Sequence, residues 1–198
     1  MPLPEEFLRE LSREEINDLS IQRYEGEVRL AESVRVVEHA AAAWRDERVV
    51  GFDTETRPAF KPGESYLPAL AQIATARTVW LLPLQRLDCR ATLRALLEAA
   101  HTVKAGVGMP DDMRALRKSF EFAEKSVLDL GAVARGHRLK QSGVRYLAAR
   151  FLGTRIPKGT KTSNWAAPRL SPQQIAYAAT DAWICRELYL KFEALQLL

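Results

Sequence analysis

The stretch "RVVGFDTET", residues 48–56, starts as an apolar strand and ends in a cluster of polar side chains. Because side chains alternate along a strand, Asp53 and Glu55 point to the same side. Two carboxylates so close repel each other, which raises the pKa of each unless a cation neutralises them. An oxygen-seeking divalent cation such as Mg²⁺ or Mn²⁺ suits this pair. The stretch therefore predicts a metal site at a strand end, against the ordinary alternative of two solvated carboxylates.

Two further acids stand in positions that invite the same interpretation. Asp112 lies in the first turn of a predicted helix that follows a strand. Asp181 lies in "QQIAYAATDAWIC", residues 173–185, one helical turn after Tyr177 and on a face that turns apolar at Ile184. Taken singly, an acid such as Asp112 ordinarily interacts with the helix dipole. Tyr177 and Asp181 would ordinarily be a core tyrosine beside a surface acid. Taken together, the four acids and the tyrosine would require all of these separate explanations to hold at once.

The order of predicted elements indicates an α/β fold. Strands near residues 49–56, 69–76 and 78–84 follow one another with tight turns, which predicts an antiparallel meander. Farther along the chain, strands alternate with helices, and the last helix is long. This order predicts a mixed sheet of five to six strands flanked by helices. We expect residues 1–26 to form a helical extension and residues 27–198 to form the main domain.

Composition and spacing exclude several classes of site. The 198 residues, 47% of them hydrophobic, fit one globular domain. No window approaches the roughly 20 apolar residues of a membrane span, and the acidic N-terminus is unlike a secretory signal, so we expect a cytoplasmic protein without membrane contact. The scattered cysteines and histidines predict neither disulfides nor a zinc site. Gly106-Val-Gly108 lacks the third glycine of a dinucleotide loop and residues 153–162 miss the Walker A pattern, so no nucleotide cofactor is expected.

The positive charge is concentrated in one segment, residues 130–180, which we call the basic block. No acid occurs between Asp129 and Asp181. A block of one sign is typical of a surface for phosphate backbones, since each neutralised phosphate releases a counterion, although a solvated basic face is the plain alternative. Its nine cations are Arg135, Arg138, Lys140, Arg145, Arg150, Arg155, Lys158, Lys161 and Arg169.

Several stretches together resemble the motifs of one enzyme family. They are "GFDTETRP" (51–58), "KAGVGMPDDMRAL" (104–116) and "LSPQQIAYAATDAW" (170–183), with "KTSNWAAPRL" (161–170) before the last. In order and spacing they are similar to the DEDD superfamily of 3′-to-5′ exonucleases, in the tyrosine variant that includes ribonuclease D and the exonuclease domain of the Werner syndrome protein. The match covers roughly residues 28–195. Spacing assigns the second acid to Asp112 instead of Asp111, and Ala176 stands where the histidine variant has its base.

The resemblance implies a ribonuclease H-like fold whose four acids hold two metal ions, Mg²⁺ or Mn²⁺. Asp53, Glu55 and Asp181 would bind the ion that activates water, and Asp53 would bridge to the second ion. Asp112 would complete the site mainly through water. Tyr177 would orient the attacking water and help to take its proton, with orientation first because a free tyrosine titrates near 10. The expected products are nucleoside 5′-monophosphates released from the 3′ end.

The implied partner is nucleic acid with a free 3′ end. Because an acidic pocket repels the phosphate backbone, cations are needed around its rim. The candidate contacts near the motifs are Arg57, Lys61, Lys104, Arg145, Lys158 and Lys161. Trp165 would either stack on a base or pack its own loop. Ribonuclease D relatives carry further C-terminal domains and this chain ends at Leu198, which favours DNA over RNA or a broad single-strand specificity.

Two alternative functions stay open at this point. A catalytically silent nucleic-acid-binding module on the same fold predicts the loss of at least one ligand, and none of the four acids is missing. An endonuclease of the same broad fold would not require the spacing between Tyr177 and Asp181.

Overall fold

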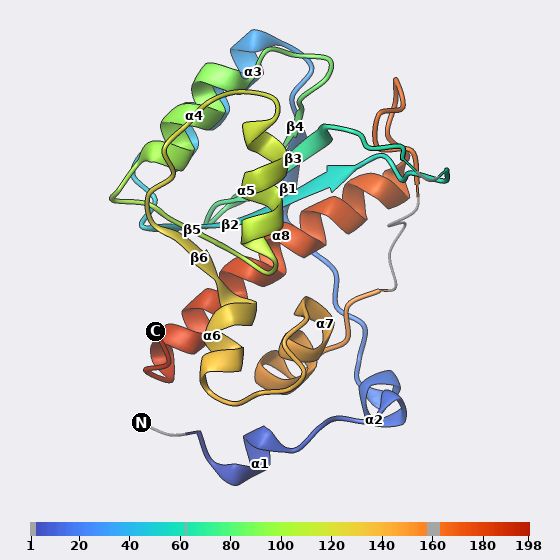
Figure 1. Ribbon diagram of the computed structural model, residues 1–198, viewed down its shortest axis with the longest axis vertical. Helices are drawn as coiled ribbons and strands as arrows, with labels where there is room; N and C mark the ends of the chain where they lie inside the picture. Colours follow the sequence, from blue (N-terminus) through green and yellow to red (C-terminus); the bar gives the residue numbers. More distant parts are fainter. Residues whose placement is uncertain (1–2, 62, 158–162) are drawn as a thin grey trace.

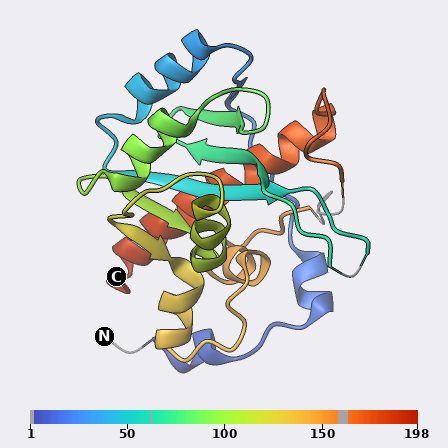
Figure 2. The same cartoon turned by 45° about the horizontal axis from the view of Figure 1, so that its top comes forward.

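The centre of the molecule is a mixed six-stranded sheet with the order β1-β4-β3-β2-β5-β6 (Figures 1 and 2). The structure, a computed structural model, describes residues 3–61, 63–157 and 163–198. β2, β3 and β4 form the predicted antiparallel meander, whereas β1, β5 and β6 pair in parallel with their neighbours. The strands are β1 Glu27–Leu30, β2 Val49–Thr56, β3 Pro68–Ala74, β4 Thr78–Pro83, β5 Val103–Gly106 and β6 Val127–Asp129.

Helices cover both faces of the sheet. The 23-residue α8 crosses one face, while α3, α4 and α5 pack on the other (Figure 1). Among the described residues, no helix is long and apolar enough to cross a lipid bilayer. The helices are α1 Glu5–Leu8, α2 Arg13–Asp18, α3 Val34–Trp44, α4 Arg90–Glu98, α5 Met109–Arg117, α6 Leu130–Gly136, α7 Val144–Leu147 with the π-helical turn η1 Ala148–Leu152, and α8 Pro172–Ala194.

Strand alternation decides which residues face which helices. Phe52 and Ile73 belong to the apolar cluster under α3, α4 and α5. Leu70 and Ala74 belong to the cluster that contains the small residues of α8. Since Glu55 pairs with Leu70 across the β2–β3 ladder, the carboxylates of β2 lie on the α8 side of the sheet.

Helix α8 lies very close to β2, and Gly51 makes this approach possible. A Cβ atom at Gly51 would lie 1.9 Å from the carbonyl oxygen of Ala182. On the helix, Ala178, Ala179 and Ala182 are completely buried, because only small side chains fit at this distance. The close crossing brings Asp181 down to the level of the strand.

Helix α5 begins at the end of β5 in a fixed orientation. Its N-cap, Gly108, has a φ of 87°, in the left-handed region that favours glycine. The carboxylate of Asp129 accepts hydrogen bonds from the backbone N–H groups of Gly108 and Gly131, both at 3.0 Å. The glycines of this segment therefore shape a turn that places the first turn of α5, with Asp112, near the end of β2.

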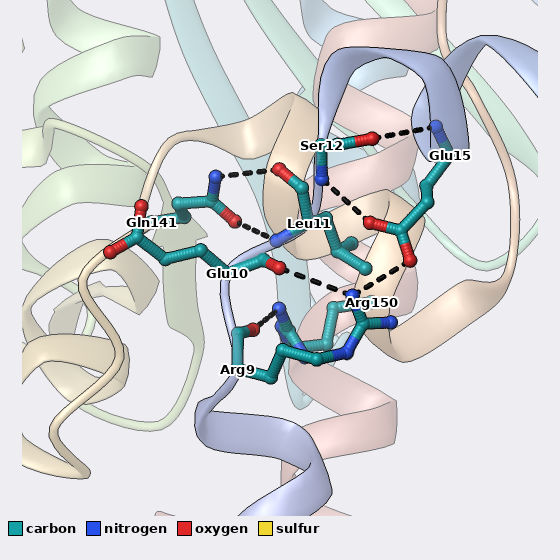
Figure 3. A network of polar contacts seen from close by, with 7 residues as sticks. All are labelled: Arg9, Glu10, Leu11, Ser12, Glu15, Gln141 and Arg150. Carbon is teal, nitrogen blue, oxygen red and sulfur yellow. Dashed lines mark hydrogen bonds and ion pairs between the residues drawn. The ribbon is translucent and has the colours of Figure 1, made fainter.

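The N-terminal segment packs along α6, α7 and η1 (Figure 3). The side-chain amide of Gln141 hydrogen-bonds both the N–H and the carbonyl of Leu11, at 2.8 and 2.9 Å. Phe7 stacks on Phe151 with ring centroids 5.5 Å apart, and Ile21 forms a parallel bridge with Arg155. Apolar and backbone contacts thus hold the extension against the main domain.

Candidate active site

Three carboxylates meet where β2 runs beneath α8. Asp53 and Glu55 come from β2 and Asp181 from α8, and one oxygen atom of each lies within 4.8 Å of the others. Glu55 and Asp181 are only 8% and 7% exposed. The acids of the first and third motifs, which are more than a hundred residues apart in the sequence, therefore share one buried site.

The electrostatics of this cluster favour a bound cation. Burial raises the pKa of Asp53 well above its usual range, and the charges of Asp112, Asp181 and Glu55 raise it further. A divalent cation among these oxygens would offset both effects. The donor set consists of carboxylates, which hard cations such as Mg²⁺ and Mn²⁺ prefer. The residues thus fit the metal ions that the sequence predicts.

Asp112 lies beside this cluster and comes from α5. Its carboxylate accepts a hydrogen bond from the hydroxyl of Thr54, the residue between Asp53 and Glu55. Burial raises the pKa of Asp112 to about 6. The neighbouring Asp111 is instead exposed and pairs with Arg114 at 2.6 Å. This contrast supports the choice of Asp112 as the fourth acid.

The raised pKa of Asp112 predicts that the metal-free protein loses stability as the pH rises. The native carboxyl keeps its proton up to a pKa of about 6, against 3.8 for a free aspartate, so stability falls as the pH rises through this window. The difference is worth roughly 3 kcal/mol. We expect the wild type to lose on the order of 2 to 3 kcal/mol of unfolding free energy relative to Asp112→Asn between about pH 4 and pH 7. Urea denaturation in EDTA measures this, and parallel pH profiles of the two proteins would contradict it.

Tyr177 lies one helical turn before Asp181 in α8, near enough for a hydrogen bond between the two side chains to affect the pKa of the phenol. Burial, the charge of Asp181 and this hydrogen bond raise the pKa of the phenol. The ring also packs against Trp165, with centroids 6.0 Å apart. The hydroxyl is therefore protonated, and the side chain is held by Asp181 and Trp165. Such a group is better suited to orienting a reactant than to acting as a base.

Two residues expected to contact nucleic acid are instead buried. Lys104 is 0% exposed and its ammonium group donates to the carbonyls of Ala99 and Thr102, at 2.7 and 2.8 Å. Burial lowers the pKa of Lys104 to about 8. Trp165 is 1% exposed and packs against Tyr177. The expectation for Lys104 is wrong, because the interior of the fold encloses its side chain and leaves no face for a phosphate. For Trp165 the structure shows the packing alternative, since the enclosed ring has no face left for a base.

The other candidate contacts have different surroundings. Arg57 and Lys61 are exposed in the loop that follows β2, and the guanidinium of Arg57 lies 4.7 Å from the ring centroid of Tyr66. Arg145 is half-buried and lines a hollow beside α2. Lys158 and Lys161 lie outside the described residues. Arg57 and Lys61 thus stay predicted contacts, on the loop adjoining the carboxylates of β2.

Part of the basic block faces the N-terminal extension of the same chain. Figure 3 shows Arg150 donating to the carbonyl of Arg9. Lys140 forms an ion pair with Glu10 at 3.2 Å, and Arg155 donates to the amide oxygen of Asn17 at 3.3 Å. These three cations of the basic block therefore bind groups of the same chain in this structure.

Two residues that shape the site, Thr54 and Gly51, were given no role by the sequence analysis. Thr54 holds Asp112, yet a threonine in a strand carries no signal of such a contact. Gly51 allows α8 to approach β2, and a lone glycine inside a strand is a known sign of close backbone approach. Only the second of these residues could have been found from the sequence.

Comparison with known proteins places this site in a family. Residues 28–195 match a family model described as 3′-5′ exonuclease. The bifunctional 3′-5′ exonuclease/ATP-dependent helicase WRN of Mus musculus is 32% identical over 153 residues, which cover 74% of this chain and 11% of that protein. The chain spans between 11% and 51% of the length of the curated relatives it matches.

Solved structures share the fold at lower sequence identity. The Nibbler EXO domain of Aedes aegypti superposes with a TM-score of 0.76 at 21% identity, covering 89% of this chain and 94% of that one. Trypanosoma brucei RNase D in complex with RNA U12 gives a TM-score of 0.75 at 17% identity, with 84% and 62% of the two chains covered. These likenesses agree with the ribonuclease H-like fold expected from the motifs.

Proposed function

Because this chain belongs to the DEDD family of 3′-5′ exonucleases, we propose that it removes nucleotides one at a time from the 3′ end of nucleic acid, using two Mg²⁺ or Mn²⁺ ions. The observation that carries this proposal is the convergence of Asp53, Glu55 and Asp181 within 4.8 Å, beside Asp112. A catalytically silent module would have no need to keep so costly a group of buried carboxylates.

The four acids would hold the two cations. Asp53, Glu55 and Asp181, whose oxygens meet within 4.8 Å, would supply most of the ligands, and Asp112 beside them would complete the set. When bound, such ions stabilise the charge on the attacking and leaving oxygens of an in-line phosphoryl displacement. Their charge would also offset the repulsion that raises the pKa of Asp53.

The remaining groups would position the reactants. The hydroxyl of Tyr177, held by Asp181 and Trp165, would orient the attacking water toward the terminal phosphodiester. As the water oxygen bonds to phosphorus, the bond to the 3′ oxygen of the preceding nucleotide breaks and that oxygen ends as a hydroxyl with a proton from the water, so a nucleoside 5′-monophosphate is released. Arg57 and Lys61 would attract the backbone phosphates that the acids alone repel.

The proposed substrate is nucleic acid with a free 3′ end, with DNA slightly favoured over RNA. A solved relative of the same fold, Trypanosoma brucei RNase D, is in complex with RNA U12, so RNA of the same sequence is the matched alternative. Side-by-side degradation of 5′-labelled DNA and RNA strands tests this preference. Faster degradation of RNA would reverse it without affecting the reaction type.

Product analysis tests the reaction itself. With Mg²⁺ or Mn²⁺, 5′-labelled strands should shorten in steps of one nucleotide, and 3′-labelled strands should release labelled mononucleotide. EDTA should stop both changes. Internal cuts would favour the endonuclease alternative, and binding without cleavage would favour the silent module. Either result contradicts the proposal.

Tyr177→Phe is expected to slow hydrolysis by about 10²-fold or more with little change in KM, because a misplacement of the attacking water by about 1 Å can cost about 10²-fold in rate. Phenylalanine keeps the ring packed on Trp165 but removes the hydroxyl. Single-turnover cleavage of a labelled strand measures the effect. Tyr189→Phe, which removes a hydroxyl from the same helix near Glu193, should keep wild-type rates. Unchanged turnover in Tyr177→Phe would make this tyrosine a purely structural residue.

A further inference from the structure

A buried amide without a partner lies on the strand next to the carboxylates. Gln72, in the middle of β3, is 0% exposed. Neither its Nε2 nor its Oε1 has a hydrogen-bond partner among the described residues. Buried polar groups are nearly always paired, and leaving one unpaired costs about 1–3 kcal/mol. An apolar residue would suit this interior position better, so the amide calls for an explanation.

The sheet register places this amide opposite Asp53. Gln72 and Asp53 are direct partners in the β2–β3 ladder. Such partners point to the same face of an antiparallel pair, with Cβ atoms about 4.5–5.5 Å apart. On the other side of Gln72, the partner on β4 is the apolar Leu81. Of its two cross-strand partners, therefore, only Asp53 carries a polar group.

The chemistry of the pair decides which end of the amide faces Asp53. An amide oxygen would be repelled by a carboxylate, whereas the NH₂ group offers two donors. The two side chains are not hydrogen-bonded in this structure, so Gln72 would have to take another side-chain rotamer for its Nε2 to reach the carboxylate. A buried water would then satisfy the amide oxygen.

We propose that Gln72 is a positioning residue that donates a hydrogen bond from Nε2 to the carboxylate of Asp53 when the cations are bound. The bond would fix which oxygen of Asp53 faces the ions. This inference rests on the proposed function. Carboxylates that ligate metals are generally held by such outer partners, and losing one typically lowers metal affinity about 10- to 100-fold.

Gln72→Met separates this role from ordinary packing. Methionine has a similar volume and removes both unpaired polar atoms, so the metal-free protein should be as stable as the wild type or more stable. Its affinity for Mn²⁺, titrated by electron paramagnetic resonance without nucleic acid, should nevertheless fall about tenfold or more. Leu81→Met is the matched control, since it places the same side chain one strand farther from Asp53 and should bind Mn²⁺ like the wild type. A Gln72→Met protein with wild-type Mn²⁺ affinity would overturn the proposal.

A second measurement does not depend on the variant folding. In a crystal structure of the wild type with Mn²⁺, Nε2 of Gln72 should lie about 2.7–3.2 Å from a carboxylate oxygen of Asp53. A separation beyond hydrogen-bond distance would overturn the proposal as well. Exonuclease assays on the same wild-type protein distinguish the two hypotheses. If the wild type is active but Gln72→Met binds Mn²⁺ with unchanged affinity, only this inference is wrong. If the wild type neither binds Mn²⁺ nor cleaves nucleic acid, the proposed function is wrong.

Discussion

Replacing Asp53 by asparagine is expected to lower the rate of 3′-terminal nucleotide release by at least about 10³-fold, because metal ions contribute several kcal/mol to such reactions. Asp53 lies among all three other acids, so its loss should weaken the binding of both ions. Asparagine keeps the shape of the side chain and removes one buried charge. The metal-free variant should therefore be at least as stable as the wild type.

Single-turnover assays and thermal unfolding in EDTA together check this prediction. Asp111→Asn is the matched control, because Asp111 is exposed, pairs with Arg114 and lies next to the fourth acid. It should keep wild-type activity. If Asp53→Asn cleaved at a rate close to the wild type, the carboxylate cluster would not be the catalytic centre.

Gly51→Ala is expected to damage the fold and the reaction together. The new Cβ atom would lie 1.9 Å from the backbone oxygen of Ala182, so α8 would have to move away from β2. Overpacking of this kind costs about 1–3 kcal/mol or more. The shift also displaces Asp181, and a misplacement of about 1 Å in a catalytic site can cost about 10²-fold in rate. Urea unfolding and single-turnover cleavage measure the two effects.

A different glycine serves as the control for this substitution. At Gly136, near the end of α6, a Cβ atom would meet no other atom within 4 Å. Gly136→Ala should therefore leave stability and activity close to those of the wild type. Wild-type stability in Gly51→Ala would show that the helix does not depend on this close crossing.

Local rules of the chain were sufficient for the outline of the fold and for the acids of the site. Alternation along a strand places Asp53 and Glu55 on one face, and helical spacing places Tyr177 beside Asp181. The meander and the later alternation of strands and helices follow from apolar patterns and turns within short windows. The choice between Asp111 and Asp112 rested on the resemblance of residues 104–116 to the family's second motif, and the different burial of the two acids supports it.

Tertiary packing decided the surroundings of those acids. Lys104 looks like any surface cation in the sequence, but its strand is covered and its ammonium group binds carbonyls of its own chain. Lys140 of the basic block forms an ion pair with Glu10 of the N-terminal extension, which lies more than a hundred residues away in the sequence. Gln72 gains its significance only from the register that sets it opposite Asp53. A sequence pattern records the chemistry of each side chain, whereas accessibility and partners depend on contacts between distant segments, which form only when the chain folds.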